Sequence, residues 1–470
     1  MNGSPVSQPT VLLYGEDGGD AYYFWQWLDG ADTEPHAFAV PRAPLADALA
    51  VLADALPEGA SSSDVTTARS RLRAGAFGSP ETELALATAL GDLFIPALLA
   101  EQLRDRADVR GGPVLVRVLP SPSCTRVPWE LLYATSIQRR LIELADVAVD
   151  PPIGLYGGRD TQPEPWRDGP ALYVLDPRAT AQHSLLGGAN ETAALKTLEQ
   201  YAVSGDTRLK ASTGRNELSS LLRAEPRPSR FLYFGHVAAA PALTHRGRSA
   251  PDASETSFVL SDSPNVYGVT GVLYGKVNPL RSRPLSALDL VQGTVGASER
   301  LPAITASYDF DPTRALTLPV EGSVPGAAIW PMPPRVAIVA CESGGDLTHV
   351  EPFGLVRACL NAGAELVTAT RWTVPTDVVF RDHERFTDGD SQPLVDLVLR
   401  VDEAQRQSDP VAVLARWQRE RLETWMKSSM PEDSLGLNPA SPVLWAAVAT
   451  TVAPRKDPRP QASKIPDSGE

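Results

Sequence analysis

Two residues whose side chains can act together in catalysis follow two apolar runs of the sequence. His236 ends the run "RFLYFGH" (230–236), and Cys341 lies within "RVAIVACESGG" (335–345). Near-continuous apolar runs are typical of strands that are buried on both faces of a parallel sheet. Because the carboxyl ends of parallel strands meet at one edge of a sheet, we expect His236 and Cys341 to lie at the same edge.

A cysteine and a histidine at that edge would form a nucleophile and its base. The imidazole takes the thiol proton, the thiolate attacks an amide carbonyl carbon, and the imidazolium then protonates the leaving amine. The oxyanion needs N–H donors, and we expect them from the backbone of Cys341 and of the segment from Gly235 to Val237. His349 is the other histidine near Cys341 in the sequence, but it does not end a strand, so we rank it below His236.

The same residue types also have purely structural uses. A histidine at a strand end is often a packing or capping residue, and a cysteine in an apolar run is often a small buried side chain. We expect that second role for Cys124 and Cys359. In "VPWELLYA" we predict structural roles for Trp129, as a buried indole with a hydrogen-bonded N–H, and for Glu130, as a carboxylate paired across the interface of two halves.

Strands and helices alternate along the second half of the chain, which predicts an α/β fold with a mainly parallel central sheet and flanking helices. Apolar runs predict strands at 9–15, 112–120, 170–177, 208–213, 230–236, 335–345 and 364–372. Helical periodicity predicts helices at 44–57, 82–107 with a break near Pro96, 190–202, 216–225 and 351–363.

Composition divides the chain into parts. Residues 1–150 form a helix-rich N-terminal α/β portion packed on the second half, and the Pro- and Gly-rich residues 151–169 form a linker. Residues 170–452 form the second domain, with a long insertion at about 238–330, and 453–470 form a flexible tail. The insertion fits a binding or lid segment as well as it fits a disordered surface loop.

Charge and cysteine content exclude several classes of function. The net charge is −14 with no basic patch, so we expect no direct nucleic-acid partner. No run of 18 apolar residues and no secretory signal pattern is present in the sequence, so we expect no membrane span. The small, odd number of cysteines, three, favours a reducing cytoplasm. The cysteines also lack metal-ligand spacing, and we expect neither a metal site nor a cofactor.

The blocks around the histidine and the cysteine resemble the CHAT family of caspase-like cysteine peptidases. The blocks are "RFLYFGHVAAA" and "RVAIVACESGG", followed by "EPFGLVRACLNAGAELVTATRWTVP", and further similar blocks are "LGDLFIPALLAEQL", "RVPWELLYA", "SFVLSD", "PLSALDLV" and "SPVLWAAVATTV", the last as a closing strand. The resemblance covers about residues 80–452. It implies a caspase-hemoglobinase-like sandwich fold and an endopeptidase with His236 as base and Cys341 as nucleophile. It also implies a bacterial signalling or defence pathway, a protein substrate and a separate activating or sensor protein.

One departure from the family concerns the residue after the histidine. Caspase-like enzymes commonly have Gly there, whereas this chain has Val237 and places its glycine before the histidine, at Gly235. The backbone N–H of Val237 remains available as an oxyanion donor, but its side chain could narrow the site.

Specificity in caspase-like peptidases often depends on the loop after the first strand, which reads "LDPRATAQH" (175–183) here. Asp176 would favour a basic P1 residue and Arg178 an acidic one, and Asp346 is a further acidic candidate. We favour Asp176. Two other classes of function compete with the peptidase: a catalytically inert scaffold of the same fold that binds partners, and a small-molecule hydrolase or transferase, for which the sequence has no Gly-rich phosphate loop and no G-x-S-x-G motif.

Overall fold

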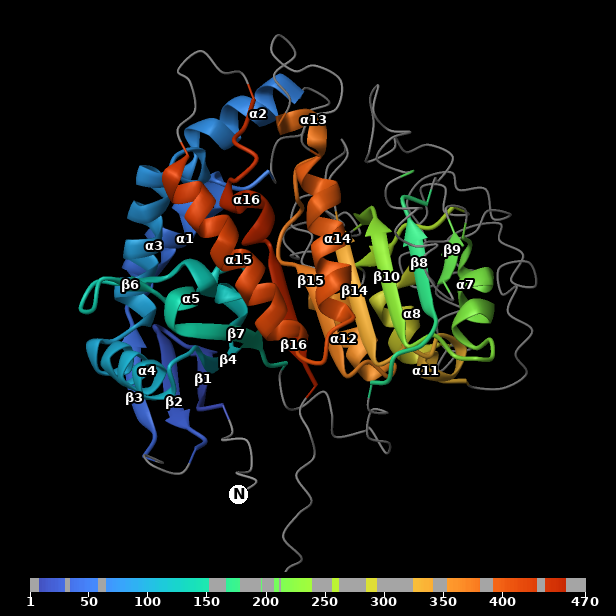
Figure 1. The fold of residues 1–470 in the computed structure, drawn as a ribbon, viewed down its shortest axis with the longest axis horizontal. Helices are drawn as coiled ribbons and strands as arrows, with labels where there is room; N and C mark the ends of the chain where they lie inside the picture. The colour runs from blue at the N-terminus through green and yellow to red at the C-terminus, as the bar shows by residue number, and fades with distance from the viewer. Residues whose placement is uncertain are drawn as a thin grey trace, which may run out of the picture.

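One sheet of eleven strands runs through the chain in the computed structural model, and both halves of the sequence contribute strands to it (Figure 1). Across the sheet the strands are β3 (His36–Val40), β2 (Ala21–Trp27), β1 (Thr10–Asp17), β4 (Val114–Leu119), β7 (Ala145–Val149), β16 (Val448–Val452), β15 (Leu366–Thr370), β14 (Arg335–Ala340), β10 (Arg230–Gly235), β8 (Ala171–Leu175) and β9 (Thr207–Lys210). The structure describes residues 8–29, 34–57, 65–151, 166–177, 196, 207–210, 213–238, 256–261, 285–293, 324–340, 353–380, 392–428 and 436–453.

The sheet contains two parallel blocks of opposite direction. Strands β9, β8, β10, β14 and β15 are parallel to one another. Strands β1, β4, β7 and β16 form the second parallel block, and β16 is antiparallel to β15. The carboxyl ends of the two blocks therefore lie at opposite edges of the sheet. Strands β2 and β3 extend the second block as an antiparallel meander.

Helices cover the sheet on both faces over the half that contains β8, β10 and β14 (Figure 1). One face packs against α14 (Pro393–Gln405), α15 (Pro410–Lys427) and α16 (Pro442–Trp445), and in the N-terminal half against α1 (Arg42–Asp54), α3 (Pro80–Phe94), α4 (Ala97–Arg110) and α5 (Leu141–Leu144). The other face packs against α7 (Arg215–Leu222), α8 (Ala287–Gln292), α11 (Gly326–Ile329) and α12 (Phe353–Asn361).

Burial on both faces explains why the central strands are apolar throughout. In β10, Leu232 and Phe234 belong to the core under α14, whereas Phe231 and Tyr233 belong to the core over α8. All six residues of β10 and all six of β14 are buried. A strand with only one buried face alternates buried and exposed positions, as β2 does.

Local sequence signals explain the helix pair at 80–110. Ser79 accepts a hydrogen bond from the Thr82 N–H as the N-cap of α3, and Pro80 is the first residue of that helix. Pro96 separates α3 from α4, and α4 ends at Gly111 in the left-handed conformation with φ of +69°. The predicted break near Pro96 is confirmed.

The α/β class, the mainly parallel sheet and the flanking helices that we expected are confirmed. Three strands of the eleven-stranded sheet, β2, β3 and β7, lie where we predicted none. The expectation of a strand over 441–452 is wrong in its first part, because Ser441 caps α16 and Pro442 starts it, so that the closing strand begins at Val448. The predicted helix at 190–202, most of 151–169, most of the insertion and the tail after Ala453 lie outside the described residues.

No single helix in the part of the chain that the structure describes is long and apolar enough to cross a membrane. Helices α3 and α4 reach that length and composition only together, and they are bent by 101° relative to each other.

Candidate functional site

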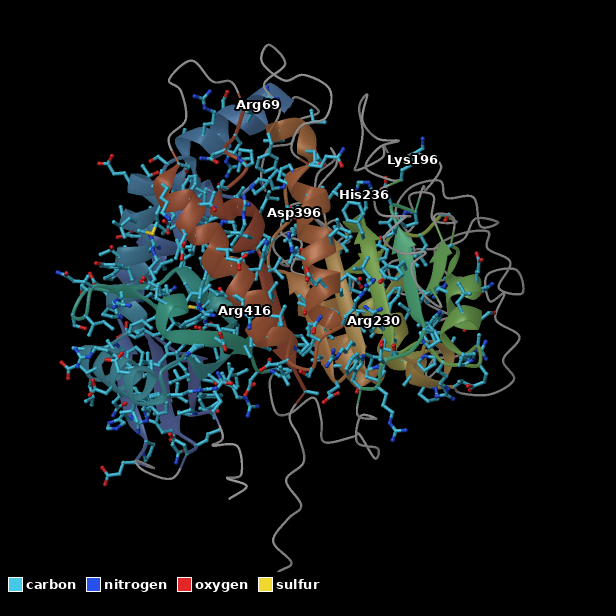
Figure 2. All side chains as sticks on the ribbon, viewed as in Figure 1. Arg69, Lys196, Arg230, His236, Asp396 and Arg416 are labelled. Carbon is cyan, nitrogen blue, oxygen red and sulfur yellow. The ribbon has the colours of Figure 1, made fainter. Side chains whose placement is uncertain are left out.

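The carboxyl edge of β8, β10 and β14 is where the sequence placed the candidate residues. Strands β10 and β14 are parallel neighbours whose register runs from Arg230 beside Arg335 to Gly235 beside Ala340. His236 follows the paired Gly235 directly, and in Figure 2 it lies at the end of β10 opposite Arg230. Cys341 is the next residue in the chain after Ala340, but it lies outside the described residues, as do Arg178, Asp346 and His349.

The backbone at His236 is fixed from both sides. The Tyr233 hydroxyl lies 2.5 Å from the His236 carbonyl oxygen and 2.7 Å from the Val259 carbonyl oxygen, within hydrogen-bond distance of both. The Val259 N–H also donates to the His236 carbonyl oxygen at 3.0 Å. The histidine is 5% exposed. Such a position can hold an imidazole in one orientation, which a general base requires.

After His236 the chain enters a small sheet of three short strands, β11 (Val237–Ala238), β12 (Ser257–Phe258) and β13 (Leu285–Ser286). Val237 pairs with Phe258, and the bond from the Val259 N–H to the His236 carbonyl makes this a non-hydrogen-bonded pair. The Val237 N–H therefore points away from β12. The Val237 side chain is 1% exposed and belongs to the apolar core with Phe258.

Gly235 is required by a close approach inside β10. A Cβ atom at this position would lie 2.7 Å from both Cζ and the hydroxyl oxygen of Tyr233 and 3.1 Å from Cδ of Pro177. The hydroxyl that the Cβ would meet is the one that bonds the His236 carbonyl. The glycine before the histidine, which the sequence showed as a departure from the family pattern, thus makes room for the ring that holds His236.

Asp176 directly follows β8 at the same edge. Its backbone N–H donates to the Phe234 carbonyl oxygen at 2.6 Å, and its φ is +43°, a left-handed conformation that Asp adopts more readily than most residues. The residue is 4% exposed. The structure therefore brings Asp176 and His236 to the ends of two neighbouring strands, with the buried Asp176 beside the end of β10.

Ala340, the last residue of β14, makes hydrogen bonds with the last residue of β15 and with the segment that follows it. The Ala340 N–H donates to the Thr370 hydroxyl at 3.3 Å, and the Val374 N–H donates to the Ala340 carbonyl at 3.2 Å. Thr370 is 1% exposed. Both backbone polar groups of the residue before Cys341 are thus bonded to Thr370 and Val374.

Between these two residues, Arg371 makes a buried ion pair with Glu130 of the N-terminal half. The guanidinium binds the carboxylate through two bonds of 2.7 and 2.8 Å and also donates to the Ala446 carbonyl at 3.0 Å. The Arg371 and Glu130 side chains are 4% and 3% exposed. The predicted pairing of Glu130 across the two halves is confirmed. The indole of Trp129 is buried, as predicted, but the prediction of a hydrogen bond is wrong, because its N–H makes none with any residue that the structure describes.

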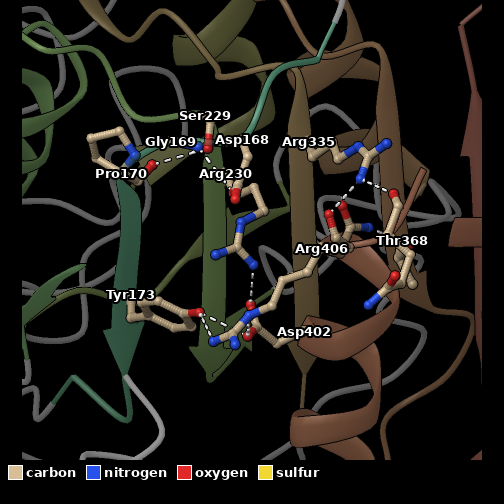
Figure 3. A network of polar contacts seen from close by, with 12 residues as sticks. Asp168, Gly169, Pro170, Tyr173, Ser229, Arg230, Arg335, Thr368, Asp402 and Arg406 are labelled. Carbon is tan, nitrogen blue, oxygen red and sulfur yellow. Dashed lines mark hydrogen bonds and ion pairs between the residues drawn. The ribbon is translucent and has the colours of Figure 1, made fainter. Parts of the chain in front are cut away.

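A second polar cluster lies at the opposite edge, at the amino ends of β8, β10 and β14 (Figure 3). Asp402 of α14 accepts hydrogen bonds from the Arg230 guanidinium at 3.1 Å and from the Tyr173 hydroxyl at 2.7 Å, and it pairs with Arg406 at 3.1 Å. Burial raises the pKa of Tyr173 to about 12, and burial lowers the pKa of Arg335 to about 10. Sequence reasoning missed this cluster, although an arginine opens both "RFLYFG" and "RVAIVA".

The other two cysteines are buried, as predicted. Cys124 and Cys359 are each 0% exposed, and burial raises the pKa of the Cys359 thiol well above its ordinary value. Among the residues that the structure describes, no three His, Cys, Asp or Glu side chains form a group that could hold a metal ion.

Comparisons with known proteins add a likeness of fold. No family model and no curated protein matches the sequence. Two solved structures of the Saccharomyces cerevisiae separase–securin complex match over 95% of this chain at 9% identity, with TM-scores of 0.46 and 0.42. The chain spans about 30% of the length of those separase chains.

Proposed function

We propose that this chain is a cysteine endopeptidase of the caspase-like kind that the sequence resemblance implies, with Cys341 as nucleophile and His236 as base. The observation that carries the proposal is the register of β10 and β14. The two strands are parallel neighbours that end level with each other at Gly235 and Ala340, and the residues that follow in the chain are His236 and Cys341.

The reaction moves two protons through His236, one while the thioester forms and one while it is hydrolysed. The imidazole accepts the proton of the Cys341 thiol, and the thiolate forms a bond to the carbonyl carbon of the scissile amide while the carbonyl π electrons move to oxygen. The Val237 N–H, which points away from β12, is a candidate donor to this oxyanion, together with the Cys341 N–H. The imidazolium protonates the amine as the C–N bond breaks, which leaves a thioester on Cys341. His236 then takes a proton from a water molecule that attacks the thioester carbon, the C–S bond breaks, and the imidazolium returns this proton to the Cys341 sulfur.

For the substrate we propose a protein cleaved after Lys or Arg. Support comes from Asp176, a buried residue at the end of β8 beside the end of β10. A carboxylate at this edge favours a basic P1 side chain, because it can accept a charge-assisted hydrogen bond from Lys or Arg. We further propose that the enzyme acts in the cytoplasm of a bacterium, in signalling or defence, and that a separate partner protein activates it.

Cleavage of a peptide library, with products identified by mass spectrometry, tests the catalytic proposal. We expect cleavage after Lys or Arg by the wild type, none by Cys341→Ala or His236→Ala, and undiminished cleavage by Cys359→Ala, the matched control with a buried thiol. Asp176→Asn should lower kcat/KM for basic P1 residues by more than for other residues. Equal cleavage by the wild type and Cys341→Ala would exclude Cys341 as the nucleophile, and no cleavage by the wild type would favour the inert scaffold.

A further inference from the structure

Arg371, which forms the ion pair with Glu130, lies in the chain between two residues that contact Ala340, the strand end before the proposed nucleophile. Arg371 is the residue after Thr370, whose hydroxyl accepts the Ala340 N–H. Three residues further on, the Val374 N–H donates to the Ala340 carbonyl. On the side of β14 away from β10, the two bonds to Ala340 therefore come from residues on either side of Arg371 in the chain.

The position of Arg371 is itself fixed by three neighbouring groups. Its guanidinium is bound at both Nη atoms by Glu130, and Nη1 also donates to the Ala446 carbonyl. Its backbone N–H donates to the Ala447 carbonyl at 2.6 Å. Bidentate pairing of a planar guanidinium with a carboxylate restricts both distance and orientation, which a single charge contact would not.

Glu130 is in turn held by the packing of its own segment. It belongs to η3 (Trp129–Leu131), whose three residues are buried. Trp129 packs against Phe94 of α3 with ring centroids 4.9 Å apart, and the Leu131 carbonyl accepts a bond of 3.0 Å from Arg140. The carboxylate that binds Arg371 is therefore anchored in the core of the N-terminal half.

We propose that Glu130 is a positioning residue for the proposed active site. Through Arg371 it fixes the segment from Thr370 to Val374, and that segment fixes Ala340 and hence the point at which the chain continues to Cys341. This inference rests on the proposed function for its catalytic consequence. Its structural part, the hold on Ala340, stands independently.

The catalytic consequence is a loss of turnover with substrate affinity kept. Displacement of a reacting group by about 1 Å can lower the rate about 100-fold. We therefore expect Glu130→Gln, which keeps the size of the side chain and removes its charge, to lower kcat about 10- to 100-fold and to change KM less than about threefold. Thr370→Val, which removes only the hydroxyl that accepts the Ala340 N–H, should have a similar effect, and Thr370→Ser should restore turnover.

Asp402→Asn is the matched control, because Asp402 is also a buried carboxylate that pairs with an arginine of this half, Arg230. It contacts β10 at the amino end, about 16 Å along the strand from Gly235 at 3.3 Å per residue. A variant that acts only by destabilising the fold should behave like Asp402→Asn, which we expect to keep the kcat of the wild type in its folded fraction.

Hydrogen exchange of the Ala340 and Val374 amides in the full chain gives a readout that does not depend on peptidase activity. We expect exchange at both amides to become at least tenfold faster in Glu130→Gln and in Thr370→Val, and to stay unchanged in Asp402→Asn. Unchanged exchange in the first two variants, or an equal loss of kcat in Asp402→Asn, would overturn the inference. A wild type without Cys341-dependent cleavage would refute the proposed function alone, since the exchange rates still decide whether Glu130 holds Ala340.

Discussion

Replacing Gly235 by alanine should disturb the histidine without touching it. The added Cβ would lie 2.7 Å from the Tyr233 hydroxyl oxygen, and the ring cannot move away without moving its hydroxyl from the carbonyl oxygens of His236 and Val259, one of which accepts its proton. Overpacking of a core costs about 1–3 kcal/mol, and a lost hydrogen bond costs about 1 kcal/mol. The reduced conformational entropy of the unfolded chain offsets about 0.7 kcal/mol of this, so the net loss of unfolding free energy should be about 1–3 kcal/mol.

Urea unfolding of the wild type and the variant, followed by tryptophan fluorescence, measures this loss. Gly169→Ala is the matched control, because a Cβ there meets only Ser229, at 3.5 Å and 3.6 Å, which are ordinary contacts. We expect the control to lie within about 0.5 kcal/mol of the wild type. A loss below about 0.5 kcal/mol in Gly235→Ala as well would refute the view that the glycine makes room for the ring that holds His236.

Three further predictions follow from other parts of the molecule. Gly91→Ala should destabilise by more than about 3 kcal/mol although alanine favours helices by about 1 kcal/mol, because the Cβ would lie 2.0 Å from the Tyr133 carbonyl oxygen; thermal unfolding checks this. Burial raises the pKa of Asp150 from 3.8, so its contribution to stability is full below pH 3.8 and is lost as the pH rises through the folded pKa. The unfolding free energy of Asp150→Asn minus that of the wild type should therefore increase with pH from 3.8 towards neutrality in urea titrations, and a constant difference would contradict this. Because Cys124 and Cys359 are fully buried, alkylation of the native protein should label Cys341 first, as read out by peptide mass spectrometry. Equal labelling of all three cysteines would show that Cys124 and Cys359 are accessible.

The strands of the second half and their parallel direction could be predicted from the sequence. The runs that became β10 and β14 are apolar at every position after the first, which only burial on both faces explains. The histidine follows one of those runs directly, so its place at the carboxyl edge could be predicted before the structure was known. The break at Pro96 was equally readable, since proline removes a backbone donor.

Contacts between distant segments could not be read in the same way. Nothing in "PWE" indicates that Arg371, more than 200 residues away, is the partner of Glu130, because any of many arginines could have served. The strand β7 escaped prediction because "ADVAV" is short and carries an aspartate, which the structure accommodates by pairing Asp146 with Arg419. The indole of Trp129 was expected to find a hydrogen-bond partner, yet ring packing against Phe94 fills its surroundings instead.

The pairing of β7 with β16 determines when the sheet can be completed during synthesis on the ribosome. Val149 of β7 pairs with Thr451 of β16, about 300 residues later in the chain. At about 5 to 20 residues per second, β7 waits about 15 to 60 s for this partner after it has been made. During that time β1, β4 and β7 can already pair with one another, and β7 presents an unpaired strand edge to other nascent chains. The last strand to be translated therefore closes the sheet, and chains that lack β16 should be the species that chaperones bind and that aggregate.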